Sequence, residues 1–291
     1  MLKFITTLID GLSLGGIYAL IALGYTMVYG IAKMLNFAHG DIIMVGGYTI
    51  AVFFAAIGMP LVTILMAIIV CMAFGLCVER FAYRPLRGAS PLAVLITAIG
   101  VSFLLQSLAQ IIFGSGKKVV SLFHFGSINV LGLNLSIATL ITLFVAATIM
   151  VALTLFVNKT KTGRAMLAVS EDRGAAQLVG VSVNMIIAIT FAIGSALAAV
   201  AGTFSIMKAP QVSVTMGAIP GIKAFTAAVI GGIGSIPGAM IGGLLLGVIE
   251  VFCNSIPALA SYTIAIEFAL LILILLVKPT GLLGKKRREK V

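Results

Sequence analysis

Charged residues are scarce in this chain. Only 9% of its 291 residues are Asp, Glu, Lys or Arg, against about 25% in a typical soluble domain. Tryptophan is absent, there are 8 prolines, and 61% of the residues are hydrophobic. This composition excludes an intrinsically disordered chain and a soluble enzyme of ordinary composition.

Cysteine is also rare. The three cysteines, Cys71, Cys77 and Cys253, all lie in apolar stretches, and no histidine cluster accompanies them. A disulfide-stapled domain is therefore excluded, and we expect all three to be buried thiols.

Motifs for nucleotide, metal or covalent chemistry are missing. The sequence contains no G-x-x-x-x-G-K-[ST] phosphate loop and no H-E-x-x-H pair,. The glycines at 232, 234 and 238 lack the spacing of a dinucleotide loop and lie between apolar runs. No nucleophile with a general base stands out. We predict no catalytic residue, no metal site and no cofactor-binding site in this chain.

Long apolar runs dominate the chain instead. A membrane-spanning helix needs about 20 apolar residues, and eight segments approach that length. No linker separates them, so we predict one transmembrane domain, 1–291, with an all-α, polytopic fold. The segments are 5–29, 41–58, 61–78, 92–113, 136–157, 184–206, 223–249 and 257–277.

Basic residues predict how these segments are oriented. The formal net charge is +11, but basic residues beside membrane spans set topology, so we predict membrane lipid rather than nucleic acid as the surroundings. Lys and Arg gather in 79–91, 158–183 and 278–291. The positive-inside rule places these stretches in the cytoplasm, which predicts an N-terminus on the outer side of the membrane and a cytoplasmic C-terminus.

Termini on opposite sides require an odd number of crossings, and one segment is visibly interrupted. Glycine is conformationally permissive and proline lacks a backbone donor, so the run 231–238 breaks the segment 223–249. Such a break is tolerated only where protein or water covers it. We predict seven crossings plus a re-entrant or broken hairpin at 223–249, against the alternative of one kinked span. Its pathway candidates are Gly232, Gly234, Ser235 and Pro237.

Polar residues in and after the first segment are further pathway candidates. Three of these candidates are tyrosines of the first segment, and their spacing places them on one helical face. The other three are an asparagine, a histidine and an aspartate, which lie where the apolar run breaks after that segment. The alternatives are ordinary helix packing for the tyrosines and, for the last three, a cytoplasmic turn in which the aspartate caps the next helix. The six candidates are Tyr18, Tyr25, Tyr29, Asn36, His39 and Asp41.

The charged stretch 158–183 predicts a short cytoplasmic helix at about 164–178. Small apolar residues recur there at intervals of three and four, as on an amphipathic helix. A face of mostly alanine favours close protein contact, and the alternative is a helix lying on lipid. The candidate partner-binding residues are Arg164, Ala165, Ala168, Glu171, Asp172 and Ala176.

Two carboxylates lie close to apolar segments. Glu267 falls near the middle of 257–277, and Glu250 follows the interrupted segment. Each carboxylate is consistent with a site on the pathway or a site for a coupling ion. Each is equally consistent with a group that is hydrogen-bonded or ion-paired near the membrane–water interface, and the sequence leaves both interpretations open.

Seven runs of this chain form a recognisable pattern, namely 16–30, 36–41, 79–87, 163–165, 171–172, 223–238 and 278–284. On these runs the chain resembles, almost end to end, the H-type, LivH-like permeases of branched-chain amino acid ABC importers. Glu267 and the short loop 114–135 depart from the pattern expected of that family.

The resemblance implies a transport subunit of the bacterial inner membrane rather than an enzyme. A second, M-type permease would complete a heterodimer, two ATPase subunits would hold ATP and Mg, and a periplasmic binding protein would deliver the amino acid. The helix at 164–178 would then be the coupling helix. The alternatives are an importer for another small solute (a polar amino acid, an amide or urea) and an ion-coupled secondary transporter using Asp41 and Glu267.

Overall fold

The computed structural model describes residues 2–123, 125–130 and 133–284. Within them, seven helices are long and apolar enough to cross a membrane, which confirms the all-α polytopic prediction. Six of these helices coincide with the first six predicted segments. The seven are α1 (Leu2–Ala32), α2 (His39–Ile57), α3 (Pro60–Val78), α4 (Pro91–Phe113), α5 (Ile137–Lys159), α8 (Val183–Lys208) and α10 (Ile236–Ser255).

The interrupted segment breaks where the sequence predicts. The helix α9 (Ala218–Gly231) ends at the glycines, and α10 begins after a four-residue turn. Both helices extend beyond the predicted limits of 223–249, and α10 alone is of spanning length. The segment is therefore a pair of helices, one short and one long.

The last predicted segment is shorter than expected. Instead of one helix over 257–277, the chain forms α11 (Pro257–Ala260), a turn, and then α12 (Thr263–Val277). At 1.5 Å per residue, α12 is about 22 Å long, less than the roughly 30 Å hydrocarbon core of a bilayer.

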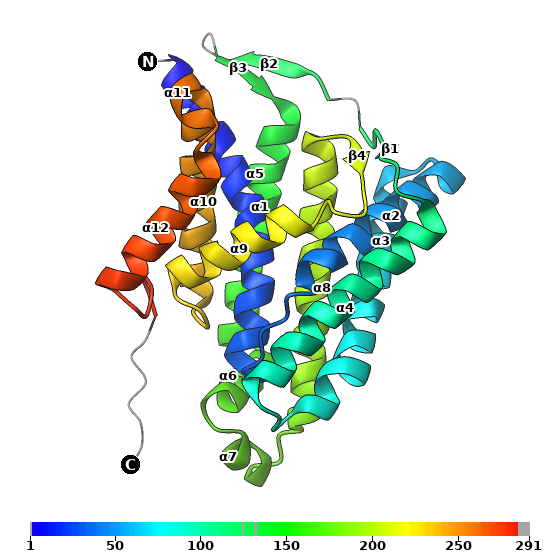
Figure 1. Ribbon diagram of the computed structural model, residues 1–291, viewed down its shortest axis with the longest axis vertical. Coiled ribbons are helices and arrows are strands. Elements are labelled where there is room, and N and C mark those ends of the chain that lie inside the picture. Colours follow the sequence, from blue (N-terminus) through cyan, green and yellow to red (C-terminus); the bar gives the residue numbers. More distant parts are fainter. Residues whose placement is uncertain (1, 124, 131–132, 285–291) are drawn as a thin grey trace.

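Short strands lie at one end of the molecule and two short helices at the other (Figure 1). The strand β1 (Lys118–Val119) pairs antiparallel with β4 (Gln211–Val212), and β2 (Ser127–Val130) pairs with β3 (Leu133–Ser136). At the opposite end lie α6 (Lys161–Glu171) and α7 (Arg173–Leu178).

The predicted helix at 164–178 is wrong as a single element. It divides between α6 and α7 because Asp172 adopts extended backbone angles, with φ −151° and ψ 113°. The Asp172 carboxylate then accepts a hydrogen bond from the Ala175 amide at 3.0 Å, which caps the start of α7.

The helix α1 occupies the centre of the fold, and glycines bring α10 against it. A Cβ atom added at Gly15 would lie 2.7 Å from the Leu244 Cα, and one at Gly11 would lie 2.9 Å from the Val248 Cα. On α10, a Cβ at Gly247 would overlap the backbone of Gly15. Small residues at this spacing let two membrane helices meet backbone to backbone.

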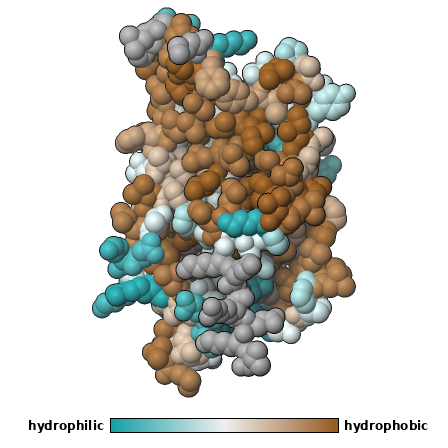
Figure 2. Space-filling model, turned by 90° about the vertical axis from the view of Figure 1, so that its left-hand side faces the viewer, coloured by the Kyte–Doolittle hydropathy of each residue, from teal (hydrophilic) through white to brown (hydrophobic). Residues whose placement is uncertain are grey.

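Apolar side chains cover the outside of the helices. Figure 2 shows hydrophobic residues over most of one face between its two ends, as expected of a surface that meets lipid. The expectation of buried thiols is confirmed for Cys71 and Cys253 but is wrong for Cys77, which is exposed on α3.

The close contact between α1 and α10 predicts the effect of adding one methyl group. We expect Gly247→Ala to lower the free energy of unfolding by about 1–3 kcal/mol, because overpacking forces the helices apart. Unfolding of the purified chain in mixed SDS micelles measures this. The control is Gly100→Ala on α4, where an added Cβ meets open space. Equal effects of the two changes would contradict the packing argument.

Candidate functional site

The turn between α1 and α2 forms the first part of the candidate site. Lys33 takes a left-handed conformation with φ 55°, and its amide donates to the Tyr29 carbonyl at 2.9 Å, which ends α1. Its ammonium group donates to the Gly30 carbonyl. This closure reverses the chain and directs the following polar residues back toward α1.

His39 and Tyr25 meet inside the protein. His39 is the first residue of α2, and its ring lies edge-on to the Tyr25 ring with centroids 4.8 Å apart. Both side chains are buried, and Gly24 makes room for the imidazole, since a Cβ there would overlap it. The His39 Nε2 atom is buried without a hydrogen-bond partner among the described residues.

Asp41 does not cap α2. The helix begins after Ala38, which itself has helical backbone angles, so the capping interpretation is wrong. The Asp41 carboxylate instead accepts a hydrogen bond from Gln106 Nε2 of α4 at 2.8 Å. A buried carboxylate is thereby satisfied across two helices.

Asn36 ties the same turn to the end of α3. Its side-chain oxygen accepts a hydrogen bond from the Tyr83 hydroxyl at 2.9 Å, and both side chains are buried. Tyr83 belongs to a single π-helical turn, Glu79–Tyr83, that continues α3. The Glu79 carboxylate of the same turn pairs with Arg87, so this end of α3 holds a second polar contact beside the one between Tyr83 and Asn36.

A second buried cluster lies on the α10 side of α1. The Lys223 ammonium group of α9 lies 2.8 Å from the Glu250 carboxylate and 3.2 Å from the Glu267 carboxylate. The Tyr18 hydroxyl donates to Glu250 at 2.6 Å. Four helices, α1, α9, α10 and α12, thus meet at one charged group.

The sequence did not single out Lys223 as a site residue. The signal was available, because a lone lysine in the apolar run of α9 requires a carboxylate partner at membrane depth. Glu250 and Glu267 were the carboxylates at hand. Both carboxylates are ion-paired with Lys223, so the structure favours paired groups over free sites for a coupling ion. Glu267 Oε2 has no hydrogen-bond partner among the described residues.

The predicted tyrosine stripe divides between the two clusters. Tyr18 contacts the Lys223 cluster and Tyr25 contacts His39, whereas Tyr29 is half-buried near the end of α1. Because Tyr18 and Tyr25 are both enclosed, neither lines an open channel in this conformation. Their role in the pathway stays a prediction.

The glycines of the break serve backbone geometry. Gly232 and Gly234 have φ of 108° and 92°, a region that favours glycine. Ser235 caps α10 by accepting from the Gly238 amide at 3.2 Å, and Pro237 stands in the first turn. The chain after α12 folds over this break, with backbone hydrogen bonds from 282 and 283 to 230 and 231.

The two helices α6 and α7 present a mixed surface. Four of their residues are buried against the bundle, namely Gly163, Met166, Val169 and Ala176. Ala176 is therefore covered in this conformation, and its contact with a partner stays a prediction. Ala165 and Ala168 are half-buried, and the charged candidates are exposed, namely Arg164, Glu171 and Asp172.

Exposed leucines and valine lie beside these charges. Leu178 is 90% exposed, Val179 is 77% exposed, and Leu167 is also exposed. Large apolar side chains in a charged region outside the spans are characteristic of a protein-contact surface. We define the docking element as α6, α7 and Val179.

Arg173 connects the docking element to α1. Its guanidinium group donates to the carbonyl of Ala32, and to that of Ile31 at 3.4 Å, at the negative end of the helix dipole. Partial burial and the nearby Arg87 charge lower the pKa of Arg173 from its usual value. A displacement of α7 would therefore act directly on the end of α1.

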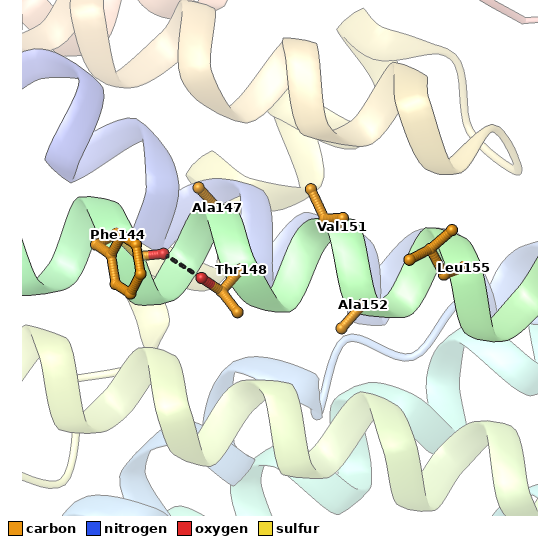
Figure 3. A pocket seen from close by; sticks show the side chains of 6 residues that line it. All are labelled: Phe144, Ala147, Thr148, Val151, Ala152 and Leu155. Atoms are coloured by element: carbon orange, nitrogen blue, oxygen red, sulfur yellow. Dashed lines mark hydrogen bonds between the residues drawn. The ribbon is translucent and has the colours of Figure 1, made fainter.

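An open furrow on α5 contributes little chemistry. Figure 3 shows its six lining side chains along one face of that helix. Thr148 donates its hydroxyl hydrogen to the Phe144 carbonyl at 2.8 Å, so the furrow offers an almost entirely apolar lining. It suits lipid or another apolar helix better than a polar solute.

Removing the lysine of the buried cluster is expected to be costly. Lys223→Met should lower the free energy of unfolding by about 3–5 kcal/mol, because two carboxylates lose their cation in an apolar surrounding. Unfolding in mixed SDS micelles measures this. The matched control is the triple change Lys223→Met, Glu250→Gln and Glu267→Gln, which removes all three charges and should recover most of the loss. A triple variant no more stable than Lys223→Met would contradict the argument that unpaired carboxylates cause the loss.

Comparison with known proteins places the chain in a family. Residues 7–275 match the family described as branched-chain amino acid transport system / permease component. The chain is 45% identical to the high-affinity branched-chain amino acid transport system permease protein BraD of Pseudomonas aeruginosa, over 99% of this chain and 98% of that protein.

Two further relatives extend the comparison. The chain is 43% identical to LivH of Salmonella typhimurium, over 100% of this chain and 98% of the relative. It is 30% identical to the probable branched-chain amino acid transport permease protein LivH of Methanocaldococcus jannaschii, over 91% of this chain and 88% of the relative. No solved structure matches the chain. The extent of the family match and the nearly complete coverage of these relatives show that this chain belongs to the branched-chain amino acid transport system permease family.

Proposed function

We propose that this chain is the membrane-spanning permease subunit of an ABC importer for branched-chain amino acids. The observation that carries the proposal is the exposed docking element tied through Arg173 to the end of α1. The full-length similarity to permeases named for branched-chain amino acid transport supports the substrate class. In this proposal the solute passes from a periplasmic binding protein to the cytoplasm.

The partners follow from what the chain can supply. A second, M-type permease completes a heterodimeric pore, and two ATPase subunits bind ATP and Mg on the cytoplasmic side. The chain has no phosphate-loop sequence, which agrees with hydrolysis in separate subunits. The chain itself is a transport subunit and holds no cofactor of its own in this proposal.

The orientation follows from the distribution of charge. We place α6 and α7 in the cytoplasm and the strands in the periplasm, with the N-terminus periplasmic and the C-terminus cytoplasmic in a bacterial inner membrane. Basic residues of 79–91 and 158–183 lie at the end of the molecule that carries α6 and α7, as the positive-inside rule requires. Residues 285–291, which carry most of the basic tail, lie outside the described residues.

Alternating access would use the contacts around α1. Closure of the ATPase subunits moves the docking element, Arg173 transmits that movement to the end of α1, and the adjoining turn carries Asn36 and His39. Rearrangement of these buried contacts changes which side of the pathway is open. The amino acid biases this equilibrium only by its different affinity for the two states.

Two other functions are less well supported. An importer for another small solute would share the docking element, and the names of the relatives favour branched-chain substrates. An ion-coupled secondary transporter would need free carboxylates, whereas Glu267 is paired with Lys223 and Asp41 with Gln106.

The apolar part of the docking element predicts a binding defect. We expect Leu178→Asp to weaken binding of the ATPase subunits at least tenfold, because the contact would bury an unpaired charge. Co-purification and titration of the ATPase subunit measure this. The control is Val119→Asp, since Val119 is 82% exposed on β1 at the opposite end. Equal loss of binding in both variants would refute the docking assignment.

Reconstituted uptake tests the whole proposal. In proteoliposomes holding both permeases and the ATPase subunits, we expect leucine uptake to require ATP and leucine-loaded binding protein. Uptake should persist when an ionophore collapses the proton gradient. Uptake by this chain alone, without ATP and driven by the proton gradient, would establish the secondary-transporter alternative instead.

A further inference from the structure

We infer that a pocket at the strand end of α4 is a contact site for a zwitterionic amino acid with an apolar side chain. The pocket has a volume of about 320 Å³. Its lining residues belong to the second half of α4 and to the segments next to β1 and β4, and Figure 1 shows the end of α4 beside these two strands. This inference rests on the proposed function and deepens it, because it names where the permease itself contacts the solute. The residues used below are Phe103, Gln106, Gln110, Lys117 and Val214.

A polar stripe leads from this pocket along α4. Ser102, Gln106 and Gln110 recur every four residues and so share one face of an otherwise apolar helix. Gln110 is exposed and Gln106 is half-buried. Eight residues from 106 to the end of α4 correspond to about 12 Å, so the stripe reaches well into the membrane thickness. Polar side chains at that depth are costly unless they face protein or a water-filled path.

The buried carboxylate of Asp41 orients Gln106. Gln106 Nε2 donates one hydrogen to Asp41 at 2.8 Å and the other to Ser102 at 3.2 Å. An ionised carboxylate only accepts hydrogen bonds, so the amide nitrogen must face Asp41 and the carbonyl oxygen turns away. Since Gln106 lines the pocket, its Oε1 is the atom of the amide left for a ligand, and Asp41 is a positioning residue.

The lining matches the three parts of such an amino acid. The carbonyl oxygens of Gln106 and Gln110 suit an ammonium group, which only donates hydrogen bonds. The Lys117 ammonium suits a carboxylate. Phe103 and Val214 supply apolar surface for the side chain. Because Lys117 precedes β1 and Val214 follows β4, pairing of these strands brings the apolar and basic parts of the lining together.

Equilibrium binding of radiolabelled leucine tests the site. The sample is the complex of both permeases and the ATPase subunits in phosphatidylglycerol nanodiscs, without binding protein. Lys117→Ala and Gln110→Leu should each raise the Kd about tenfold, as loss of a charge-assisted hydrogen bond predicts. The control is Lys118→Ala, because Lys118 lies over the Phe113 ring at 5.0 Å and not in the pocket lining; it should leave the Kd within twofold.

Competing ligands separate the roles of the residues. Leucinamide lacks the carboxylate, so the preference for leucine over leucinamide should disappear in Lys117→Ala. The acid 4-methylpentanoate lacks the ammonium group. In Gln110→Leu, the ratio of the Kd for 4-methylpentanoate to the Kd for leucine should therefore become smaller. Asp41→Asn should also reduce the preference for leucine over 4-methylpentanoate, but it should leave the preference for leucine over leucinamide unchanged. A general loss of structure would reduce both preferences.

The outcomes distinguish this site from the proposed function. If ATP-dependent leucine uptake is intact but all variants bind leucine within twofold of the unaltered chain, the site is overturned and the function stands. If the unaltered complex takes up no leucine, both the binding site and the proposed function are overturned. A phosphatidylethanolamine headgroup shares the zwitterionic chemistry. If adding that lipid raises the leucine Kd tenfold or more, the headgroup is the occupant and the amino-acid assignment is overturned.

Discussion

The close contact of α1 with α10 is the constraint on which the rest of the structure depends. Glycines on both helices bring the two backbones together, which leaves α1 enclosed in the centre of the bundle rather than facing lipid. Because α1 is central, polar side chains on its different faces meet partners from α2, α9 and α10. Packing of small residues therefore determines where the polar chemistry of this membrane protein lies.

The two polar clusters differ in what they can do. The Lys223 cluster joins four helices through charges that would be expensive to separate in an apolar surrounding, so it suits a rigid joint. Among the described residues, the region around His39 and Asp41 is held by hydrogen bonds and ring contacts without an ion pair, and it adjoins the turn that Arg173 connects to the docking element. We expect movement there to cost less free energy than at the ion pairs, so in the proposed mechanism this turn is the part that moves.

Sequence reasoning recovered the site in part. Glycines and a proline at 231–238 predicted the break between α9 and α10, because their backbone properties act locally. The pairing of Lys223 with Glu250 and Glu267 was missed, since those residues are separated by 27 and 44 positions and no local pattern links them. Ala176 was assigned to the outer face because periodicity alone does not say which side of a helix meets the bundle.

By itself the sequence determined that this chain is a polytopic helical membrane protein, since the length of an apolar run is a local property. It also shows that the chain carries no phosphate-loop motif. It also indicated a charged docking segment between two spans. Only the tertiary structure decided that Asp41 orients Gln106, that Asp172 divides the docking segment, and that Lys223 neutralises two carboxylates. The reason is physical: a buried polar group takes its character from the partners that packing supplies, and packing brings together residues that are distant in the chain.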